Sequence, residues 1–309
     1  MMNARPLIIG TRGSSLALAQ TNLVRALIHR VHPRLEIEIK IIKTSGDRLT
    51  KTSLAHSGVK GIFTKELEQA LFRNRIDLAI HSLKDMPVAI PAGLVLAAIV
   101  QREDPADVLV GHPSTNLDEP AVVFTSSPRR AFQAKLLWPR CESREIRGNV
   151  ETRLNKIAEG TSGEAVLLAA AGLRRLDFLK GDDVLGALRL DPALPFRRLS
   201  IEEMIPAPGQ AAIALEIRNA DGELREKLRP VNHAATSAAV SSERAFLGAL
   251  GGGCATPVAA HARVGLDGLN LVAVVQNENG SIWRGERQGE RRNAENIGRS
   301  LAEACLSRV

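Results

Sequence analysis

Short apolar segments alternate with amphipathic helical segments through the first two thirds of this 309-residue chain. The segment 35–44, LEIEIKIIKT, alternates with a period of two and predicts a strand, whereas 14–31 has helical periodicity after a serine that can cap it. Such alternation is typical of an α/β fold built on a largely parallel sheet. Further strands are predicted at 6–10, 77–83, 121–127, 143–148, 165–172 and 211–218, and helices at 64–75, 128–138 and 150–160.

The alternation divides into two α/β units, followed by a C-terminal unit of different character. A second series of strands and helices starts near 101–108, and the strand at 211–218 would return the chain to the first sheet. The pattern then changes to a helix at 234–250, three strands joined by the turn sequences GLDG and NENG, and a final helix at 294–309. We therefore expect α/β domains at 1–101 with 208–228 and at 104–205, and an α+β domain at 231–309.

The composition excludes several classes of protein. The chain has 41 Lys and Arg against 34 Asp and Glu, but no tyrosine, few aromatics and no basic block, so nucleic acid is not the expected partner. Three distant cysteines, Cys141, Cys254 and Cys305, argue against a disulfide framework and a metal site. The first apolar run is too short for a signal segment, and no run reaches membrane-spanning length. We therefore expect a cytoplasmic protein that does not bind membranes.

Cations follow nearly every predicted strand, at the strand end where open α/β sheets bind ligands. In TSSPRR, 125–130, Ser127 can cap the next helix and Pro128 fits its first position, so free N–H groups and two arginines point to one place. No GxxxxGK[ST] or GxGxxG motif is present, which favours a ligand with several carboxylates or phosphates. The strand-end groups are Arg12, Ser14, Lys84, Asp85, Thr125, Ser126, Ser127, Arg129, Arg130, Arg147, Arg153, Arg174 and Arg175.

Asp85 is a carboxylate among these cations. Two interpretations stay open from the sequence: an ion pair or helix cap, or a group that stabilises developing positive charge or moves a proton. His81 and His56 are each more typical of packing or surface positions. The segment LGGGCATP, 250–257, places Cys254 on a loop with few side chains, which is compatible with a reactive thiol.

Nine motifs of the chain, among them HSLKDMP and RGNVETRL, occur in the order typical of porphobilinogen deaminase (hydroxymethylbilane synthase). The most specific are HSLKDMP and RGNVETRL, and the similarity runs nearly from end to end. The others are TRGSSLALAQ, GVKGIFTKELEQAL, QREDPADVLV, TSSPRR, AAAGLRRL, PAPGQAAIALE and GGGC. The chain therefore resembles this family.

The resemblance implies two α/β domains of the periplasmic-binding-protein type (type II) and a third, α+β domain with a reactive cysteine. A dipyrromethane cofactor would be joined to Cys254 through a thioether. The enzyme would condense four porphobilinogen molecules head to tail with release of ammonia, and hydrolysis would free the linear hydroxymethylbilane. Each pyrrole carries an acetate and a propionate, so porphobilinogen and the growing chain would be the partners of a monomeric enzyme.

The resemblance also assigns roles to individual residues. Asp85 would hydrogen-bond pyrrole N–H groups and stabilise the cationic azafulvene formed when ammonia leaves. His56, Lys60 and Phe63 would belong to a loop over the site. The sequence places this loop at 46–61, and Phe63, which flanks it, is also typical of a core position. Carboxylates of cofactor and substrate, and the cleft around them, would be contacted by Arg12, Ser14, Gln20, Ser82, Lys84, Thr125, Ser126, Ser127, Arg129, Arg130, Arg147, Gly148, Arg153, Arg175 and Gln210.

The chain departs from the family pattern at a few positions. His56 replaces a lysine of many relatives, which would make its contact with a growing chain weaker or pH-dependent. Pro128 replaces the usual leucine, Ala211 replaces a glycine, and CATP stands where CQVP is common. The stretch 176–205 is longer than the family norm. None of these changes removes a group that the chemistry needs.

Two other functions explain part of the pattern. A non-catalytic cytoplasmic polycarboxylate-binding protein of the same α/β type accounts for the arginines at the strand ends, but it leaves Cys254 unexplained. A nucleic-acid-binding protein rests on the basic charge alone, and salt-sensitive DNA binding would support it.

Overall fold

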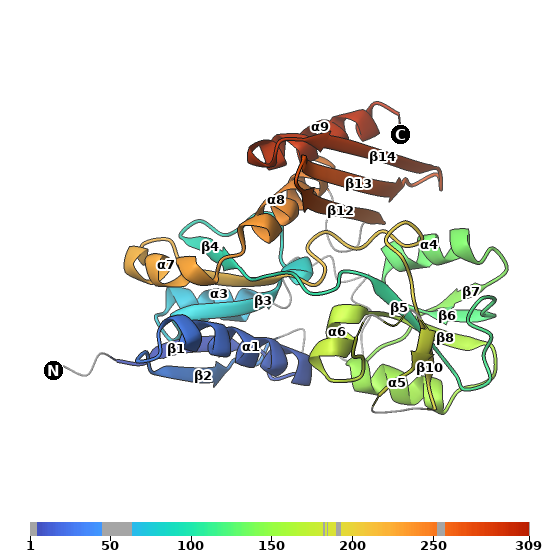
Figure 1. Ribbon diagram of the computed structural model, residues 1–309, viewed down its shortest axis with the longest axis horizontal. Helices are drawn as coiled ribbons and strands as arrows, with labels where there is room; N and C mark the ends of the chain where they lie inside the picture. Colours follow the sequence, from blue (N-terminus) through green and yellow to red (C-terminus); the bar gives the residue numbers. More distant parts are fainter. Residues whose placement is uncertain are drawn as a thin grey trace.

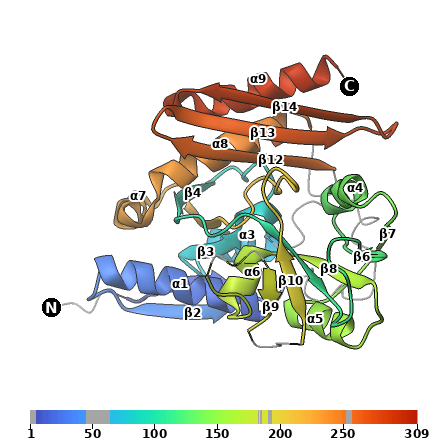
Figure 2. The same ribbon diagram turned by 45° about the vertical axis from the view of Figure 1, so that its right-hand side comes forward.

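Three β-sheets organise the chain, in a computed structural model that describes residues 5–44, 64–181, 183, 185–189, 193–251 and 257–308. Figure 1 shows two α/β units side by side, with the third sheet and its helices above both of them. Figure 2 shows the same third sheet spanning across the two units from another side. The fold is therefore mixed α/β with a separate C-terminal α+β unit, as predicted.

The first sheet has the strand order β2-β1-β3-β11-β4. The first three of these strands are parallel, and β11 lies antiparallel between β3 and β4. The strand at 211–218 thus returns the chain to the first sheet, as predicted. The elements of this unit are β1 (Leu7–Thr11), α1 (Ser15–Val31), β2 (Ile37–Ile41), α3 (Lys65–Phe72), β3 (Leu78–Ser82), η2 (Leu83–Asp85), β4 (Leu94–Ile99), β11 (Ile213–Arg218), α7 (Gly222–Leu228) and η3 (Arg229–Val231).

The second sheet repeats this order as β7-β6-β8-β5-β10, with β9 added at the edge. Here β6, β7 and β8 are parallel, and β5 is the antiparallel strand between β8 and β10. The elements are β5 (Asp107–Gly111), β6 (Val122–Phe124), α4 (Pro128–Leu137), β7 (Glu142–Arg144), α5 (Val150–Ala158), β8 (Glu164–Ala169), α6 (Ala170–Arg175), β9 (Leu185–Ala187) and β10 (Pro195–Arg198).

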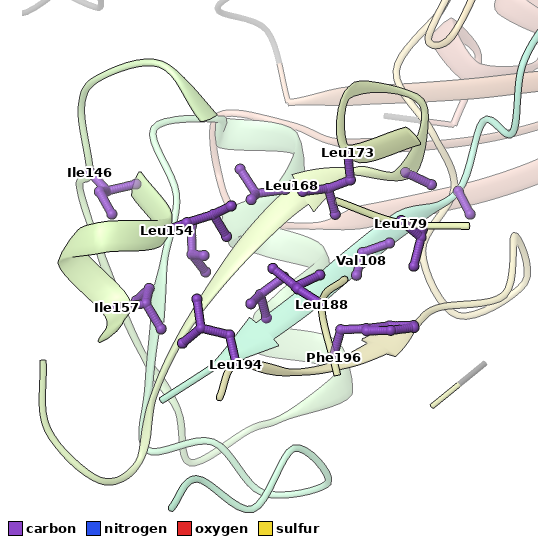
Figure 3. Packing of buried hydrophobic residues seen from close by; sticks show 14 of the residues in the cluster. Val108, Ile146, Leu154, Ile157, Leu168, Leu173, Leu179, Leu188, Leu194 and Phe196 are labelled. Carbon is purple, nitrogen blue, oxygen red and sulfur yellow. The ribbon is translucent and has the colours of Figure 1, made fainter. Parts of the chain in front are cut away.

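Each α/β unit buries apolar side chains on both faces of its sheet, because alternate residues of a strand point to opposite sides. In the second unit, Val108 and Val110 of β5 pack with α5 and α6 (Figure 3), whereas Leu109 packs with α4 on the other face. In the first unit, Ile9 packs on the α1 side and Ile8 on the α3 side. Both sheets are therefore covered by helices on two sides.

Two crossing segments, 100–106 and 199–212, join the α/β units. The backbone of Glu103 donates to the carbonyl of Ala211 and the Arg102 guanidinium donates to the carbonyl of Gln210, so the segments lie against each other. Each crossing segment leads into the antiparallel strand of the other sheet: 100–106 leads into β5, and 199–212 leads into β11. This arrangement is that of the periplasmic-binding-protein type II fold, which confirms the predicted fold class.

The C-terminal unit is an antiparallel sheet with two helices on one face. Phe246 of α8 and Leu301 of α9 are buried against strand residues such as Leu271. The opposite face contacts the second α/β unit, where Ala259 and Val274 join a cluster with Phe132 of α4. The elements are α8 (Ala234–Ala249), β12 (Val258–Gly265), β13 (Gly268–Gln276), β14 (Ile282–Gly289), η4 (Arg291–Asn293) and α9 (Ala294–Leu306).

The structure corrects two sequence expectations. The strand predicted at 165–172 ends at Ala169, and Ala170 begins α6, because a run of alanines favours helix as soon as the sheet no longer pairs it. The strand predicted at 143–148 covers only Glu142–Arg144. Both α/β sheets are largely parallel, as predicted, and each includes one antiparallel strand that follows a crossing. Among the helices of the described residues, none is long and apolar enough to span a membrane.

Candidate active site

A small cavity of about 70 Å³ lies at the carboxyl end of β3 in the first unit. It takes Arg12 and Ser14 from the loop after β1, and Ser82 and Asp85 from the end of β3 and the short helix η2 that follows. Four predicted site residues from two neighbouring strand ends are therefore brought together. The full lining is Arg12, Ser14, Leu16, Ala17, Gln20, Thr64, Ile80, His81, Ser82 and Asp85.

Hydrogen bonds within α1 and β3 hold the polar lining of this cavity in place. The Ser14 side chain accepts from the backbone N–H of Ala17 and caps α1, so that of Ser14 and Ser15, the two caps predicted, Ser14 is the one used. The Gln20 amide and the Ser82 hydroxyl are linked by contacts of 2.9 and 3.1 Å, and Gln20 is buried. The pairing ties α1 to β3 beneath the cavity.

Asp85 is the last residue of η2 and is half-buried. It caps no helix in the part of the chain that the structure describes, nor does it form a hydrogen bond or ion pair there. The cap interpretation therefore finds no support among those residues, whereas the charge of Asp85 does act on the neighbouring Lys84, without a direct ion pair. A carboxylate placed in a cavity without such a partner is available to a cationic or N–H-bearing ligand.

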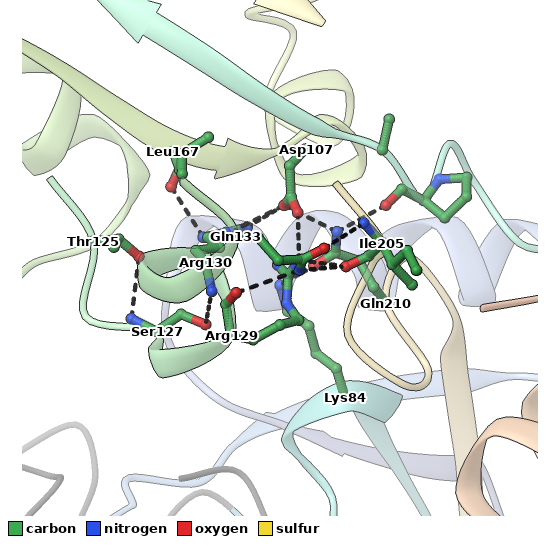
Figure 4. Close-up of polar contacts among 12 residues, drawn as sticks. Lys84, Asp107, Thr125, Ser127, Arg129, Arg130, Gln133, Leu167, Ile205 and Gln210 are labelled. Atoms are coloured by element: carbon green, nitrogen blue, oxygen red, sulfur yellow. Dashed lines mark hydrogen bonds and ion pairs between the residues drawn. The ribbon is translucent and has the colours of Figure 1, made fainter. Parts of the chain in front are cut away.

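Arg129 and Arg130 begin α4 of the second unit and are 4% and 7% exposed. Both guanidinium groups contact Asp107, the fully buried first residue of β5, as Figure 4 shows. Arg130 Nη2 lies 2.6 Å from Oδ1 and Arg129 Nη1 lies 2.8 Å from Oδ2. Burial raises the pKa of Asp107, but the two arginine charges outweigh it and hold the pKa well below its usual range.

Gln210 connects this arginine pair to Lys84 of the first unit. Its amide nitrogen donates to Asp107 Oδ1 at 3.0 Å and to the carbonyl of Pro105 at 2.7 Å. Its amide oxygen accepts from Lys84 Nζ at 3.3 Å. Burial, reinforced by the nearby charge of Arg130, lowers the pKa of Lys84 to about 8. Three predicted site residues, Arg129, Arg130 and Gln210, thus meet at the Asp107 carboxylate, and Gln210 links them to Lys84 of the first unit.

Two more predicted arginines carry pKa values lowered by burial. The pKa of Arg153 falls to about 10 because of burial and the charge of Arg130, which places it near the same cluster. Burial also lowers the pKa of Arg175 to about 10, and its guanidinium donates to the carbonyl of Ala211 at 2.6 Å. Within the described residues, the buried Nε atoms of Arg129 and Arg175 have no hydrogen-bond acceptor. These N–H groups remain available for ligand oxygens.

The remaining predicted groups of the second unit shape the loops around this cluster. Ser127 caps α4 with Pro128 at its first turn, as predicted, and the Thr125 hydroxyl accepts from the Ser127 N–H. The Ser126 hydroxyl donates to the carbonyl of Ile146. Arg147 is paired with Glu145 at 2.7 Å. Gly148 has a φ of +116°, a conformation that disfavours any side chain there.

Four predicted site residues, Cys254, His56, Lys60 and Phe63, lie outside the described residues. Cys254 belongs to the sequence between the end of α8 and the start of β12.

Sequence reasoning missed Asp107 as the partner of the arginine pair. An acidic residue that opens an apolar strand, DVLVG, was the available signal, because a buried carboxylate requires a cation. It also missed Glu216, whose carboxylate lies 2.9 Å from His81 Nε2 between neighbouring buried strands. The packing interpretation of His81 agrees with this contact.

The fold and the site together define a two-lobed α/β protein with a polar cavity at the carboxyl end of β3 and a buried cluster of cations where the two lobes meet. Two family models match the chain: "Porphobilinogen deaminase, dipyromethane cofactor binding domain" over residues 7–226, and "Porphobilinogen deaminase, C-terminal domain" over 237–307. The chain belongs to the porphobilinogen deaminase family.

Curated relatives are similar over almost the whole chain. A porphobilinogen deaminase of Syntrophobacter fumaroxidans is 41% identical, covering 99% of this chain and 96% of its own length. That of Carboxydothermus hydrogenoformans is 38% identical, with 98% and 94% covered. That of Nitrosomonas europaea is 39% identical, with 98% and 95% covered.

Proposed function

We propose that this protein is a transferase of tetrapyrrole biosynthesis that condenses four porphobilinogen molecules into hydroxymethylbilane with release of ammonia. The observation that carries this proposal is an excess of positive charge in the cluster at the junction of the two units. The charges of Arg129, Arg130, Asp85 and Asp107 act on Lys84, and the charge of Arg130 also acts on Arg153, so four cations stand against two carboxylates. Cations held in this way by burial favour an anionic ligand that restores the balance of charge.

A dipyrromethane cofactor on Cys254 fits the donors that the cleft provides. The unpaired Nε–H groups of Arg129 and Arg175 and the ammonium of Lys84 are suited to carboxylates, and a dipyrromethane carries several. When bound, the cofactor supplies the pyrrole end to which the first substrate is joined. We assign the holding of its carboxylates, and those of the substrate, to the cations and hydroxyls predicted from the sequence.

We assign to Asp85 the stabilisation of positive charge on the reacting substrate. As ammonia leaves, positive charge spreads over the substrate pyrrole and its N–H becomes a stronger donor. A half-buried carboxylate at this point accepts that N–H and lowers the energy of the charged state. Among the described residues Asp85 accepts no hydrogen bond and forms no direct ion pair, although its charge acts on Lys84, and this leaves its oxygens open to a substrate N–H.

Three separate cores support the division into three domains, 1–101 with 208–228, 104–205 and 231–309. We also propose a cytoplasmic monomer that binds neither nucleic acid nor membranes. The arginines of the cluster turn inward rather than form a basic surface, which argues against a nucleic-acid partner. Cys141 and Cys305 are buried free thiols, in keeping with a reducing compartment.

Intact mass and ammonia release together test the proposed function. The purified protein should exceed its sequence mass by two condensed pyrrole units and should release ammonia from porphobilinogen. Cys254→Ser should lack both the adduct and turnover, whereas Cys141→Ser, a change at a buried free thiol, should keep both. An unmodified but active wild type would contradict the cofactor assignment, and an inactive wild type that binds dicarboxylates would favour the non-catalytic alternative.

A further inference from the structure

Asp107 is the point where hydrogen-bond donors from two structural units meet. Its Oδ1 accepts from Arg130 Nε at 3.0 Å, Arg130 Nη2 at 2.6 Å and Gln210 Nε2 at 3.0 Å. Its Oδ2 lies 2.8 Å from Arg129 Nη1. The side chain is fully buried. One carboxylate therefore fixes the positions of three side chains that the proposed function uses.

The orientation of Gln210 depends on this contact. Its amide nitrogen has two hydrogens, and these are taken by Asp107 and by the carbonyl of Pro105. The amide oxygen must therefore face the other way, where it accepts from Lys84 Nζ. Rotating the amide by 180° would place its oxygen against two acceptors and its nitrogen against the ammonium of Lys84.

We propose that Asp107 is a positioning residue that, through Gln210, joins Lys84 of the first α/β unit to the Arg129–Arg130 pair of the second, so that these cations bind ligand carboxylates as one site. Lys84 follows β3, Asp107 opens β5, and Gln210 lies on the crossing segment between β10 and β11. The connection therefore passes through the junction of the two units (Figure 4). This inference rests on the proposed function and deepens it.

The charges around Lys84 predict the direction in which its pKa should change when Asp107 is replaced. The carboxylates of Asp85 and Asp107 face the ammonium and favour its charged form, whereas Arg130 and Arg129 disfavour it. Removing the charge of Asp107 while the pocket stays closed should lower the pKa of Lys84 further. Loosening the pocket instead would admit water and raise the pKa towards that of a free lysine.

Asp107→Asn separates these two outcomes. Asparagine keeps an oxygen for Arg130 and Gln210 but replaces Oδ2, which faces Arg129, by an NH₂ group. The readout is the rate of acetylation of Lys84 against pH, mapped by peptide mass spectrometry in full-length protein with Cys254→Ser, so that no variant carries an adduct. The midpoint should move about one unit to lower pH, equivalent to a tenfold change in proton affinity. An unchanged or raised midpoint would overturn the inference.

Asp104→Asn is the matched control. Asp104 is also a well-buried carboxylate near the first crossing segment, but its partners are Arg198 at 2.6 Å and Arg174 at 3.4 Å. The charges that shift the pKa of Lys84 most are those of Arg130, Asp85, Asp107 and Arg129, and Asp104 is not one of them. Its replacement should leave the acetylation midpoint of Lys84 unchanged, even if it lowers the stability of the protein.

Gln210→Leu tests the same inference where Asp107→Asn fails to fold or the reagent fails to reach Lys84. It leaves the Asp107–arginine contacts in place and removes the hydrogen bonds that join Asp107 and Pro105 to Lys84 through the Gln210 amide. In the enzyme with an intact Cys254, KM for porphobilinogen should rise about tenfold, as for loss of a hydrogen bond to a charged group, with a smaller change in kcat. A KM within twofold of wild type would contradict the inference. A wild-type protein that has neither the adduct nor turnover would count against the proposed function. The acetylation midpoint of Lys84 can be measured in either case, so the two failures are distinguishable.

Discussion

Arg102 and Glu243 form a bidentate ion pair between the first crossing segment and helix α8, with N–O distances of 2.6 and 3.0 Å. The Glu243 carboxylate is fully buried and also accepts from the backbone N–H groups of Gly209 and Ala262. Gly209 belongs to the second crossing segment and Ala262 to β12. One side chain thus holds both crossing segments against the C-terminal unit.

Glu243→Gln should therefore lower the free energy of unfolding by about 3–5 kcal/mol, because it leaves the Arg102 guanidinium buried without a counter-charge. Chemical denaturation followed by circular dichroism measures the change. The control is Glu142→Gln, which removes a surface pair with Arg144 and should have no measurable effect. Equal effects of the two changes would mean that burial of the pair is unimportant.

Glu243 should also contribute to acid denaturation. Burial raises the pKa of Glu243, but the charge of Arg102 outweighs it and lowers the pKa from 4.5 to about 2. A carboxyl with a depressed pKa in the folded state stabilises the protein above pH 4.5, and this contribution is lost as the pH falls towards 2. The unfolding free energy of Glu243→Gln should consequently fall less steeply than that of wild type across this range. Parallel curves for the two proteins would refute the assignment.

Asp85→Ala should retain the mass adduct in whole or in part but lose most ammonia release. A fall in kcat of about 10²–10³-fold is typical when a charge-stabilising group is removed from an active site. Asp118→Ala, at a surface position, should keep the wild-type rate. Normal turnover of the Asp85 variant would remove that residue from the proposed catalytic role.

Substrate binding should weaken as the pH rises through about 8. Lys84 is charged below this pKa and loses its charge above it, so its attraction for substrate carboxylates is lost on the alkaline side. KM for porphobilinogen measured from pH 7 to 9.5 should therefore rise. Lys84→Arg should move this rise to higher pH because a guanidinium stays charged, whereas Lys180→Arg, at an exposed site, should not.

Gly298→Ala should destabilise the C-terminal unit. A Cβ atom at this position of α9 would lie 2.2 Å from the backbone oxygen of Ser242 in α8, so the two helices would have to separate. We expect a loss of about 1–3 kcal/mol in the free energy of unfolding, as is typical of overpacked cores. Gly222→Ala is the control, since a Cβ there meets no atom within 4 Å. Equal stability of both variants would show that α8 and α9 are not closely packed at this point.

Local sequence patterns were sufficient for most elements and for the helix starts. Ser14 and Ser127 cap the helices that follow them, because capping depends on residues within one turn. The strand predicted at 165–172 was wrong in its last three residues, since alanines between a strand and a helix carry little information about where pairing stops. Most of the architecture thus follows from the order of local patterns.

The partners of the buried charged side chains could not be predicted from the sequence. The arginines of TSSPRR were predicted to bind ligand anions, and this stays a prediction, but nothing near them in sequence indicates that Asp107 lies between them. Glu243 is 141 residues from Arg102, and His81 is 135 residues from Glu216. Such pairs are brought together only when separate units pack, so no periodicity in the chain reveals them.

The antiparallel strand β11 has a consequence for the order in which this protein is made. It lies between β3 and β4, yet it follows them by more than a hundred residues in the chain, after the entire second α/β unit. On the ribosome, the second sheet can acquire all its strands while β3 and β4 still have no partner between them. The N-terminal unit is thus the first to be synthesised but not the first to be completed, and its strand edges stay open until residue 218 has emerged.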